Sequence, residues 1–386
     1  MVPNGWTLIK LKDIGKCITG LTYSPKNVVN DGLLVLRSSN IQDSKLSFND
    51  NVYVDIEVDK KSKTQFGDIL LCVRNGSKNL IGKSAFIYKE NEQLAHGAFM
   101  SLFRSNETPD YTFQLFQSSQ FFRQVNQNLG ATINSINSGN LYQFKFPYPP
   151  FKEREKIAKI LSTWDKAIST TERLIDNSKQ QKKALMQQLL TGKKRLLDDS
   201  GKQFEGEWEE VKLGEISHIT TGSSNREDSS LDGEYTFFDR SEDIRTSSRY
   251  LFDSEAVIVP GEGQDFVPKH FEGKFDLHQR TYAIMNFDGC VGRFLFYYIG
   301  YHRHYFLAQA VGSTVKSLRL PMFQKMPINL PNQLEQAKIA SVLNNADREI
   351  KILQQQLADL KQEKKALMQQ LLTGKRRVKI DEKEVA

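Results

Sequence analysis

Two stretches of the chain carry apolar residues at alternating steps of four and three positions, the spacing of one face of an α-helix. The stretches cover residues 153–191 and 335–373, and neither contains proline or glycine. A glycine follows each stretch directly. Helices of about 37 residues would be roughly 55 Å long, and such helices need an apolar partner. Because the chain between them can return, the pattern predicts an antiparallel coiled coil.

The apolar side chains of these stretches are the candidates for the helix seam or for docking of partner proteins. The first stretch supplies Ile157, Leu161, Trp164, Ile168, Ile175, Leu185 and Leu189. The second stretch supplies Ile339, Leu343, Ile350, Leu353, Leu357, Leu360, Leu367 and Leu371. The first seam is interrupted by Thr171, Ser178 and Lys182, whereas the second is a regular heptad stripe.

The two stretches belong to an internal duplication. Residues 182–193 read KKALMQQLLTGK, and the same twelve letters return at residues 364–375, 182 positions later. The same offset relates residues 129–137 to 311–319, and the opening around Trp6 has a partner around Trp208. Each half of the chain therefore has a matching start, a matching tail and a divergent middle.

The divergent middles have the composition of strands and turns. Short apolar or β-branched runs alternate with Gly, Asn, Asp and Ser, and they lie at residues 32–37, 67–74, 83–89, 235–240, 256–261 and 281–287. A helical stretch is predicted after them in each half, at residues 112–127 and 292–310. The expected fold is α+β: two globular modules and two long antiparallel helices, related by a pseudo-twofold internal repeat. The expected parts are residues 1–151 (first module), 152–200 (central helix and linker), 201–332 (second module) and 333–386 (C-terminal helix and basic tail).

Composition narrows the choice of partner and compartment. The 386 residues include 53 Lys+Arg against 46 Asp+Glu, a net charge of +7, which favours a polyanion such as nucleic acid without requiring one. No apolar run reaches the roughly 18 residues of a membrane span. The three cysteines are far apart, which fits a reducing cytoplasm. No metal site is expected, because His302 and His304 have no cysteine or acid at ligand spacing.

The order of motifs in both halves resembles the DNA specificity subunit (HsdS-type) of type I restriction–modification systems. The resemblance covers nearly the whole chain. It is carried by the Trp6 and Trp208 openings, by the Arg-x-x-Asn-Ile stretch at residues 37–41, and by GDILL followed by Arg-x-Gly at residues 67–76. The segments GATINSI and GSTVKSL and the two Leu-Leu-Thr-Gly-Lys endings complete it. The second half departs from the pattern, since Asp243 stands where the first half has Asn40.

The resemblance implies a non-catalytic subunit that binds double-stranded DNA. Each module would be a target recognition domain for one half of a bipartite sequence, and the helices would set the spacing between them. The repeated tails would dock two copies of an adenine methyltransferase subunit, and a restriction endonuclease subunit would complete the complex. S-adenosylmethionine, ATP and Mg²⁺ would then sit on those partners, so no cofactor is expected on this chain.

Base reading needs side chains with fixed hydrogen-bond geometry, such as Arg to guanine or Asn to adenine, while Lys, Ser and Thr hold phosphates. Two polar turns that follow apolar strands supply the first-module candidates Arg37, Ser38, Asn40, Arg74, Asn75, Ser77 and Lys78. The second-module candidates are Arg226, Arg240, Arg245, Arg249, Gln264 and Lys269. The repeated segments add Thr132, Thr314 and Lys316, for which phosphate contact and a structural turn are equally good interpretations. A solvated hairpin turn is the alternative interpretation for the first-module candidates.

Two other classes of protein remain open at this point. A coiled-coil adaptor that binds only proteins would lack salt-sensitive affinity for DNA. An enzyme with its own methylase or nuclease site is the third possibility. Against it, the segment Tyr148-Pro149-Pro150-Phe151 lacks the amide or acid with which adenine methyltransferases hold the target amine. The DNA target itself cannot be read from the sequence.

Overall fold

The computed structural model of the chain describes residues 2–89, 94–129 and 134–380. These residues form two compact units, the first of Met1–Thr171 with Gln356–Ala386 and the second of Glu172–Gln355. Both long helices, α5 (Phe151–Leu189) and α9 (Gln333–Leu371), contribute one part to each unit. This division cuts across both helices, whereas the domain boundaries expected from the sequence keep each helix whole, and those boundaries stay predictions.

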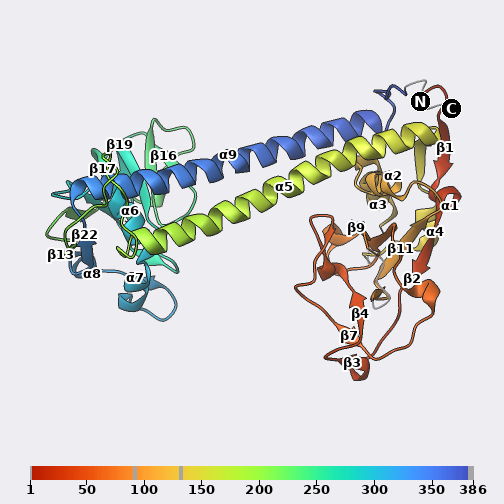
Figure 1. Cartoon of the computed structure of the whole chain (residues 1–386), viewed down its shortest axis with the longest axis horizontal. Helices are drawn as coiled ribbons and strands as arrows, with labels where there is room; N and C mark the ends of the chain where they lie inside the picture. The colour runs from red at the N-terminus through yellow and green to blue at the C-terminus, as the bar shows by residue number, and fades with distance from the viewer. Residues whose placement is uncertain (1, 90–93, 130–133, 381–386) are drawn as a thin grey trace. The chain divides into compact units, whose positions relative to one another are not determined.

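The first unit contains two four-stranded sheets (Figure 1). One has the order β2 (Gly15–Thr19), β11 (Met100–Ser105), β8 (Asp68–Cys72), β9 (Ser84–Phe86). The other has the order β10 (Leu94–His96), β4 (Leu33–Leu36), β7 (Tyr53–Val54), β3 (Val28–Val29), with β10 parallel to β4. The short strands β5 (Ile41–Gln42) and β6 (Lys45–Leu46) form a separate hairpin.

The second unit builds the same plan as one six-stranded sheet. Its order is β14 (His218–Thr221), β20 (Thr281–Met285), β17 (Phe252–Pro260), β19 (Lys269–Leu277), β15 (Tyr235–Phe238), β16 (Arg245–Ser247). The long strand β19 pairs antiparallel with β17 and parallel with β15. It therefore does alone what β9 and β10 do in the first unit, where β9 pairs with β8 and β10 with β4.

A small two-stranded sheet near the start of the long helix recurs in both units. In the first unit β1 (Thr7–Lys10) pairs with β12 (Lys145–Tyr148), and in the second β13 (Glu209–Lys212) pairs with β22 (Pro327–Leu330). Short helices lie beside these strands, α1 (Leu11–Ile14) and α4 (Ser138–Tyr142) in the first unit and α8 (Leu320–Gln324) in the second. The matching starts and tails of the sequence thus become matching structures.

The helical stretch predicted in each half is broken into two helices. The first unit has α2 (Pro109–Phe116) and α3 (Ser119–Asn128), and the second has α6 (Gly292–Tyr301) and α7 (His304–Gln309). In the first unit the break falls at Ser118, whose extended backbone and side-chain oxygen cap α3 by accepting the Phe121 amide N–H. The prediction of a helical stretch is therefore confirmed in each half, with a break that the apolar pattern did not indicate.

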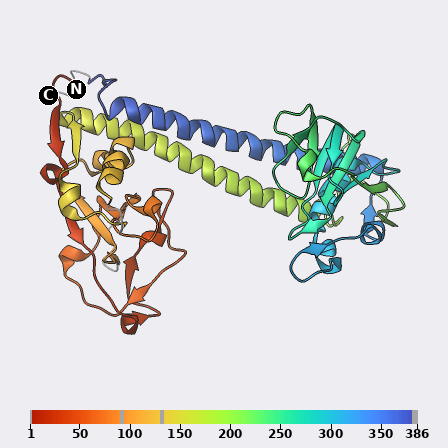
Figure 2. The same cartoon turned by 180° about the vertical axis from the view of Figure 1, so that it is seen from behind.

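The antiparallel pairing of α5 and α9 is confirmed within each unit, where Figure 1 and Figure 2 show the helices side by side. In the first unit the Lys364 Nζ lies 2.6 Å from the Asp165 Oδ1. In the second unit the Lys182 Nζ lies 2.5 Å from the Asp347 Oδ1. Each lysine and each aspartate is 182 positions from its counterpart, so the two contacts are one contact repeated by the pseudo-twofold relation.

The predicted seam lies on the buried side of both helices. Eight of its side chains are buried, namely Ile157, Leu161, Ile175, Leu189, Ile339, Leu343, Ile350 and Leu371. The others are partly buried, namely Trp164, Ile168, Leu185, Leu353, Leu357, Leu360 and Leu367. The polar interruptions are satisfied locally, since Ser178 Oγ donates to Glu349 Oε1 at 3.1 Å and Thr171 Oγ1 to the Ala167 carbonyl at 3.1 Å. A role of the apolar seam residues in docking partner proteins stays a prediction.

Both helices begin and end two residues earlier than the sequence pattern suggested. Past each helix end, Gly192 has φ +67° and Gly374 has φ +69°, a region that favours glycine. The turn lets the Lys194 amide N–H donate to the Gln188 carbonyl, and the Arg376 amide N–H to the Gln370 carbonyl. The repeated Thr-Gly-Lys ending is thus the helix stop of each tail.

None of the helices in the described residues combines the length and the apolar character that a membrane span needs. The described residues also contain no cluster of three or more His, Cys, Asp or Glu side chains suited to hold a metal ion.

Candidate nucleic-acid interface

Polar loops of the first unit gather at the edge where β4 and β8 end and β11 begins. The loop after β4 and the loop after β8 are joined by a hydrogen bond from Asn75 Nδ2 to Ser38 Oγ at 3.0 Å. The described segment that begins at residue 134 joins them, because the Asn75 amide N–H donates to the Asn134 carbonyl at 3.1 Å. Asn134 Nδ2 donates in turn to the Gly76 carbonyl at 2.9 Å. The two predicted polar turns therefore form one surface.

Arg74 is an exposed cation of this surface. Its side chain is exposed, and no carboxylate among the described residues forms an ion pair with it. Its guanidinium carbon lies 5.6 Å from the centre of the Phe99 ring, and its amide N–H donates to the Phe99 carbonyl at 3.0 Å. Phe99 is itself 58% exposed. A guanidinium on an aromatic face keeps its N–H groups directed outward and free to donate.

The neighbouring candidates divide into exposed and internally bonded side chains. Ser77 and Lys78 are exposed, and the Ser77 amide N–H donates to Asn75 Oδ1 at 3.0 Å, which fixes the turn. Arg37 is partly buried and its Nη2 lies 2.8 Å from Asp50 Oδ1. Arg37 would have to exchange this carboxylate for a phosphate or base in order to contact DNA. Thr132 lies outside the described residues.

Asn40 requires a correction, because its side chain is fully buried. Its Oδ1 accepts the Arg37 amide N–H at 2.9 Å, and its Nδ2 donates to the Ser47 carbonyl at 2.9 Å and to the Asp50 carbonyl at 3.2 Å. The amide is therefore occupied by the chain itself. Asn40 shapes the loop that presents Arg37 and Ser38, and in this conformation it cannot reach a base.

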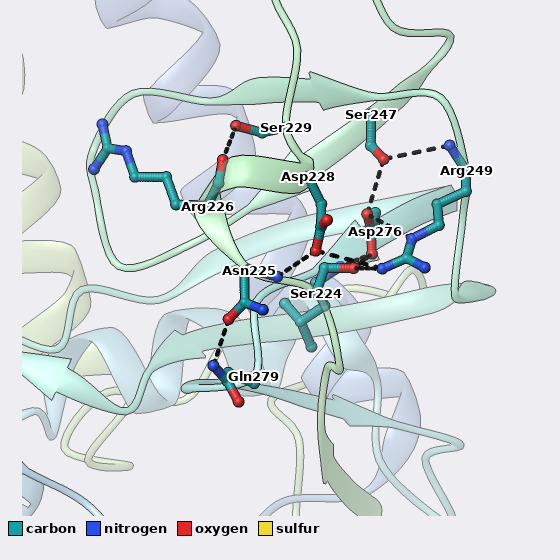
Figure 3. A network of polar contacts seen from close by, with 10 residues as sticks. Ser224, Asn225, Arg226, Asp228, Ser229, Ser247, Arg249, Asp276 and Gln279 are labelled. Carbon is teal, nitrogen blue, oxygen red and sulfur yellow. Dashed lines mark hydrogen bonds and ion pairs between the residues drawn. The ribbon is translucent and has the colours of Figure 1, made fainter.

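The second unit places Arg249 in a polar network around a buried aspartate (Figure 3). Asp276 is fully buried and accepts hydrogen bonds from Ser224 Oγ at 2.5 Å and Ser247 Oγ at 2.8 Å. Arg249 Nη2 donates to Ser224 Oγ at 2.9 Å and lies 3.6 Å from Asp228 Oδ2. The arginine is still 53% exposed, so the network holds one side of its guanidinium and leaves the other side to solvent.

The remaining second-unit candidates differ in how free they are. Arg226 Nη1 lies 3.6 Å from Asp239 Oδ2, and Arg245 is partly buried on strand β16. Lys269 Nζ donates to the Ser241 carbonyl at 2.5 Å, and burial lowers the pKa of this lysine. Gln264 and Thr314 are exposed, while Lys316 is partly buried on β21 (Lys316–Ser317). The assignment of all of these residues to DNA contact stays a prediction.

Three residues of these surfaces were missed by the sequence reasoning. Phe99 and Arg280 occupy the turns before β11 and β20, and Glu262 lies on β18 (Glu262–Gly263). Glu262 forms ion pairs with both Arg240 and Arg280. A single exposed phenylalanine or a glutamate carries no DNA-binding signal in a sequence, so only the pairing of strands reveals these positions.

Comparison with known proteins finds one family model that matches most of the chain. The family model of the type I restriction modification DNA specificity domain matches twice, at residues 3–178 and 205–362. The putative type I restriction enzyme MjaX specificity subunit of Methanocaldococcus jannaschii is 27% identical over 411 residues, covering 98% of this chain and 95% of that protein. The EcoKI specificity subunit of Escherichia coli is 30% identical over 199 residues, covering 50% of this chain and 43% of that protein.

Solved structures agree on the fold. The S subunit of a type I restriction–modification system from M. genitalium has a TM-score of 0.66 at 14% identity, covering 96% of this chain and 98% of that one. A chain from a structure of type I restriction–modification complex assembly and conformational transition has a TM-score of 0.55 at 17% identity, with coverage of 96% and 98%. With the family model matched across both units, the chain belongs to the type I restriction–modification DNA specificity family.

Proposed function

We propose that the chain selects a two-part DNA sequence, with the polar surface of each unit reading one part. The observation that carries the proposal is the contrast between the halves. Their helices, caps and small sheets repeat, whereas the loop residues at equivalent strand ends differ, Arg74 and Phe99 in one unit against Glu262 and Arg280 in the other. Two units with the same helices, caps and small sheets but different residues on their polar surfaces suit a DNA target made of two unlike parts.

The chemistry of the first unit fits reading in the major groove. An arginine fork donates two hydrogen bonds to guanine O6 and N7 and discriminates by about 1–3 kcal/mol against another base. Arg74 offers such a fork on an aromatic support, while Ser77 and Lys78 beside it are placed to bind phosphate and set the register.

We further propose that the paired helices set the distance between the two parts of the target. Each helix has 39 residues, which corresponds to about 58 Å of α-helix. The repeated Lys–Asp contacts and the unbroken helices support a stiff spacer. A stiff spacer makes affinity depend on the number of base pairs between the parts.

The assembly is also part of the proposal. Two copies of a methyltransferase subunit would bind the repeated tails, because a pseudo-twofold chain offers two equivalent surfaces to one partner. A restriction endonuclease subunit would add cleavage. In this scheme the chain is not catalytic and acts in the cytoplasm, and S-adenosylmethionine, ATP and Mg²⁺ bind to the partners.

Selection from a randomised duplex library by the purified full chain tests the proposal. We expect enrichment of two short elements at one fixed spacing, and weaker binding when a single base pair is inserted between them. Affinity should also fall steeply as salt rises. Equal binding with and without the inserted base pair would remove the spacer role. Absence of salt-sensitive DNA binding would instead favour the protein-only coiled-coil adaptor.

A further inference from the structure

The turn before β11 in the first unit and the turn before β20 in the second unit are built in the same way. Met100 pairs with Cys72 on the neighbouring strand, and Thr281 pairs with Pro260. In both turns the first backbone N–H of the strand is bonded back to the turn, Met100 to the Gly97 carbonyl at 2.8 Å and Thr281 to the His278 carbonyl at 3.0 Å. The residue before the strand is Phe99 in the first unit and Arg280 in the second.

The loop after the neighbouring strand, β8 in the first unit and β17 in the second, also matches in register between the two units. Arg74 lies two residues after Cys72 and forms an isolated bridge with Ser135. Glu262 lies two residues after Pro260 and pairs with Ser317. Because Ser135 and Ser317 are related by the 182-residue offset of the repeat, Arg74 and Glu262 hold the same place.

The two units therefore carry different chemical groups at one equivalent position. The first unit has a guanidinium lying on an aromatic ring, while the second has a carboxylate that holds guanidinium groups. Glu262 forms an ion pair with Arg280 through Oε1, and its Oε2 lies 3.4 Å from Arg240 Nη1. The Glu262 side chain is only 14% exposed, whereas Arg240 is 56% and Arg280 is 61% exposed. The Glu262 carboxylate is therefore the buried member of the group, and the guanidinium groups of Arg240 and Arg280 are exposed to solvent.

We propose that Arg240 and Arg280 are the base-reading residues of the second unit and that Glu262 is the residue that positions them. The inference rests on the proposed function and assigns the chemistry of its second half, namely guanine edges in the major groove. Each arginine uses Nη1 for the carboxylate, so its other N–H groups are left to donate to O6 and N7. A shared carboxylate also offsets the repulsion between the two cations.

Neighbouring groups fit this arrangement. The Arg280 amide N–H donates to His278 Nδ1 at 3.1 Å, which fixes the histidine tautomer as an acceptor on that side. Lys316 lies opposite Gly263 in the short β18–β21 pair, close enough in register to hold a phosphate beside the forks. The surface thus has base-reading and phosphate-binding groups on adjacent positions.

The test is library selection with the full chain, four test variants and one control variant. Arg280→Ala and Arg280→Lys remove the fork, the second without loss of charge, and Arg240→Ala removes the other fork. Glu262→Gln removes the carboxylate and leaves both arginines. Arg173→Ala is the charge-matched control, since Arg173 is an exposed helix residue of the same unit. The element read by the first unit serves in every variant as the measure of a folded, DNA-competent chain.

We expect the arginine variants to lose roughly 5- to 150-fold of preference at one or two base pairs of one element, with the other element unchanged. Glu262→Gln should lose preference at those same base pairs while its affinity for unrelated DNA rises, because a negative charge has been removed. The control should keep both preferences.

Two results would overturn the assignment. Retention of the wild-type preference in Arg280→Ala and Arg280→Lys would exclude the base-reading role of Arg280. A Glu262→Gln variant with uniformly higher affinity and intact preference would show a carboxylate that only repels DNA. A wild-type chain without any sequence preference is a different failure, because it would refute the proposed function before any variant is made.

Discussion

The guanidinium of Arg377 forms a two-pronged ion pair with the carboxylate of Glu153, although the two residues are 224 positions apart. Glu153 is only 6% exposed, and the Trp6 indole N–H also donates to it at 3.3 Å. Arg195 and Glu335 form the same pair in the second unit, with Nε–Oε1 and Nη2–Oε2 both at 2.6 Å. Each pair ties the segment after one long helix to the first turn of the other.

Arg377→Ala should destabilise the first unit by about 2 kcal/mol, because it leaves a buried carboxylate without its cation. This value lies below the 3–5 kcal/mol of fully buried pairs, since Arg377 is 41% exposed. Faster hydrogen exchange in residues 2–10 and 372–380 would register the change. Arg376→Ala, the exposed neighbour, is the matched control and should leave the exchange rates as they are.

Arg195→Ala should cost the second unit more than Arg377→Ala costs the first. Arg195 is 18% exposed and Glu335 is fully buried, so water compensates less for the lost ion pair. Exchange rates in residues 205–213 and 333–343 provide the measurement. An equal or smaller effect than that of Arg377→Ala would contradict the link between burial and cost.

Reversal of one partner in the repeated helix contact should weaken the helix pair, and reversal of both should restore it. Asp165→Lys opposes two lysines, and Lys364→Asp opposes two aspartates, whereas the double variant recreates the attraction with its sign exchanged. The expected coupling is about 0.5–1 kcal/mol for a partly exposed pair. Thermal unfolding of the single and double variants measures it, and additive losses would mean that the two side chains do not interact.

Arg74→Ala should relax the DNA preference at one base pair of the element read by the first unit, by roughly 5- to 150-fold. Phe99→Ala should reduce preference at that same base pair by only about 2- to 5-fold, since it removes the support of the guanidinium and not the fork. Phe99→Trp should retain the preference. Library selection gives all three values, and loss at a different base pair in Phe99→Ala would separate the two residues.

His96 should make the first unit less stable in mild acid. Its Nε2 hydrogen-bonds the Ile18 carbonyl at 2.9 Å, its buried Nδ1 has no partner among the described residues, and burial lowers the pKa of the ring. Asp68 favours the protonated ring and Arg104 opposes it, both less strongly than burial. Because the unfolded chain takes up this proton first, the stability is complete above about pH 6.5 and declines below it.

Hydrogen exchange of residues 94–105 between pH 7.5 and 5.5, corrected for intrinsic rates, measures this decline. In His96→Gln the side-chain amide can still donate to the Ile18 carbonyl but cannot take up the proton. The pH dependence of this segment should therefore flatten in the variant. An unchanged slope would assign the effect to another group.

The sequence was sufficient for the parts of the fold that depend on local pattern. The heptad stripe identified both long helices, and strand composition located β4, β8, β15, β17 and β20. The recurring Thr-Gly also has a steric reason. A Cβ at Gly20 would lie 2.1 Å from the Gly97 carbonyl oxygen, and one at Gly222 would lie 1.7 Å from the Leu277 carbonyl oxygen.

What the sequence could not supply depends on strand pairing between distant segments. Asp68 holds Arg104 across strands β8 and β11 in the first unit, with Nη2–Oδ2 at 2.7 Å. The equivalent pair in the second unit is Ala256 and Met285, an apolar contact in the same register. The equivalence of Arg74 with Glu262 is hidden for the same reason, because the loops around them differ in length and composition.

Asn40 illustrates the limit on the site itself. An Arg-x-x-Asn pattern after a strand is compatible both with base reading and with a side chain that closes its own turn. The difference lies in burial, which here comes from the carbonyl groups of Ser47 and Asp50 that close over the amide. Exposure therefore separates Arg74 from Asn40, although both are polar residues in the turn after a strand.

The core of the first unit has a consequence for synthesis on the ribosome. That core includes Met368, Leu371 and Leu372, which pack with Trp6, Ile157 and Leu161. Translation delivers these three residues only after the entire second unit has been made. Until then the half of the chain that is made first keeps part of its apolar surface exposed to water. The half that is made later can complete its core as soon as the beginning of α9 has been synthesised.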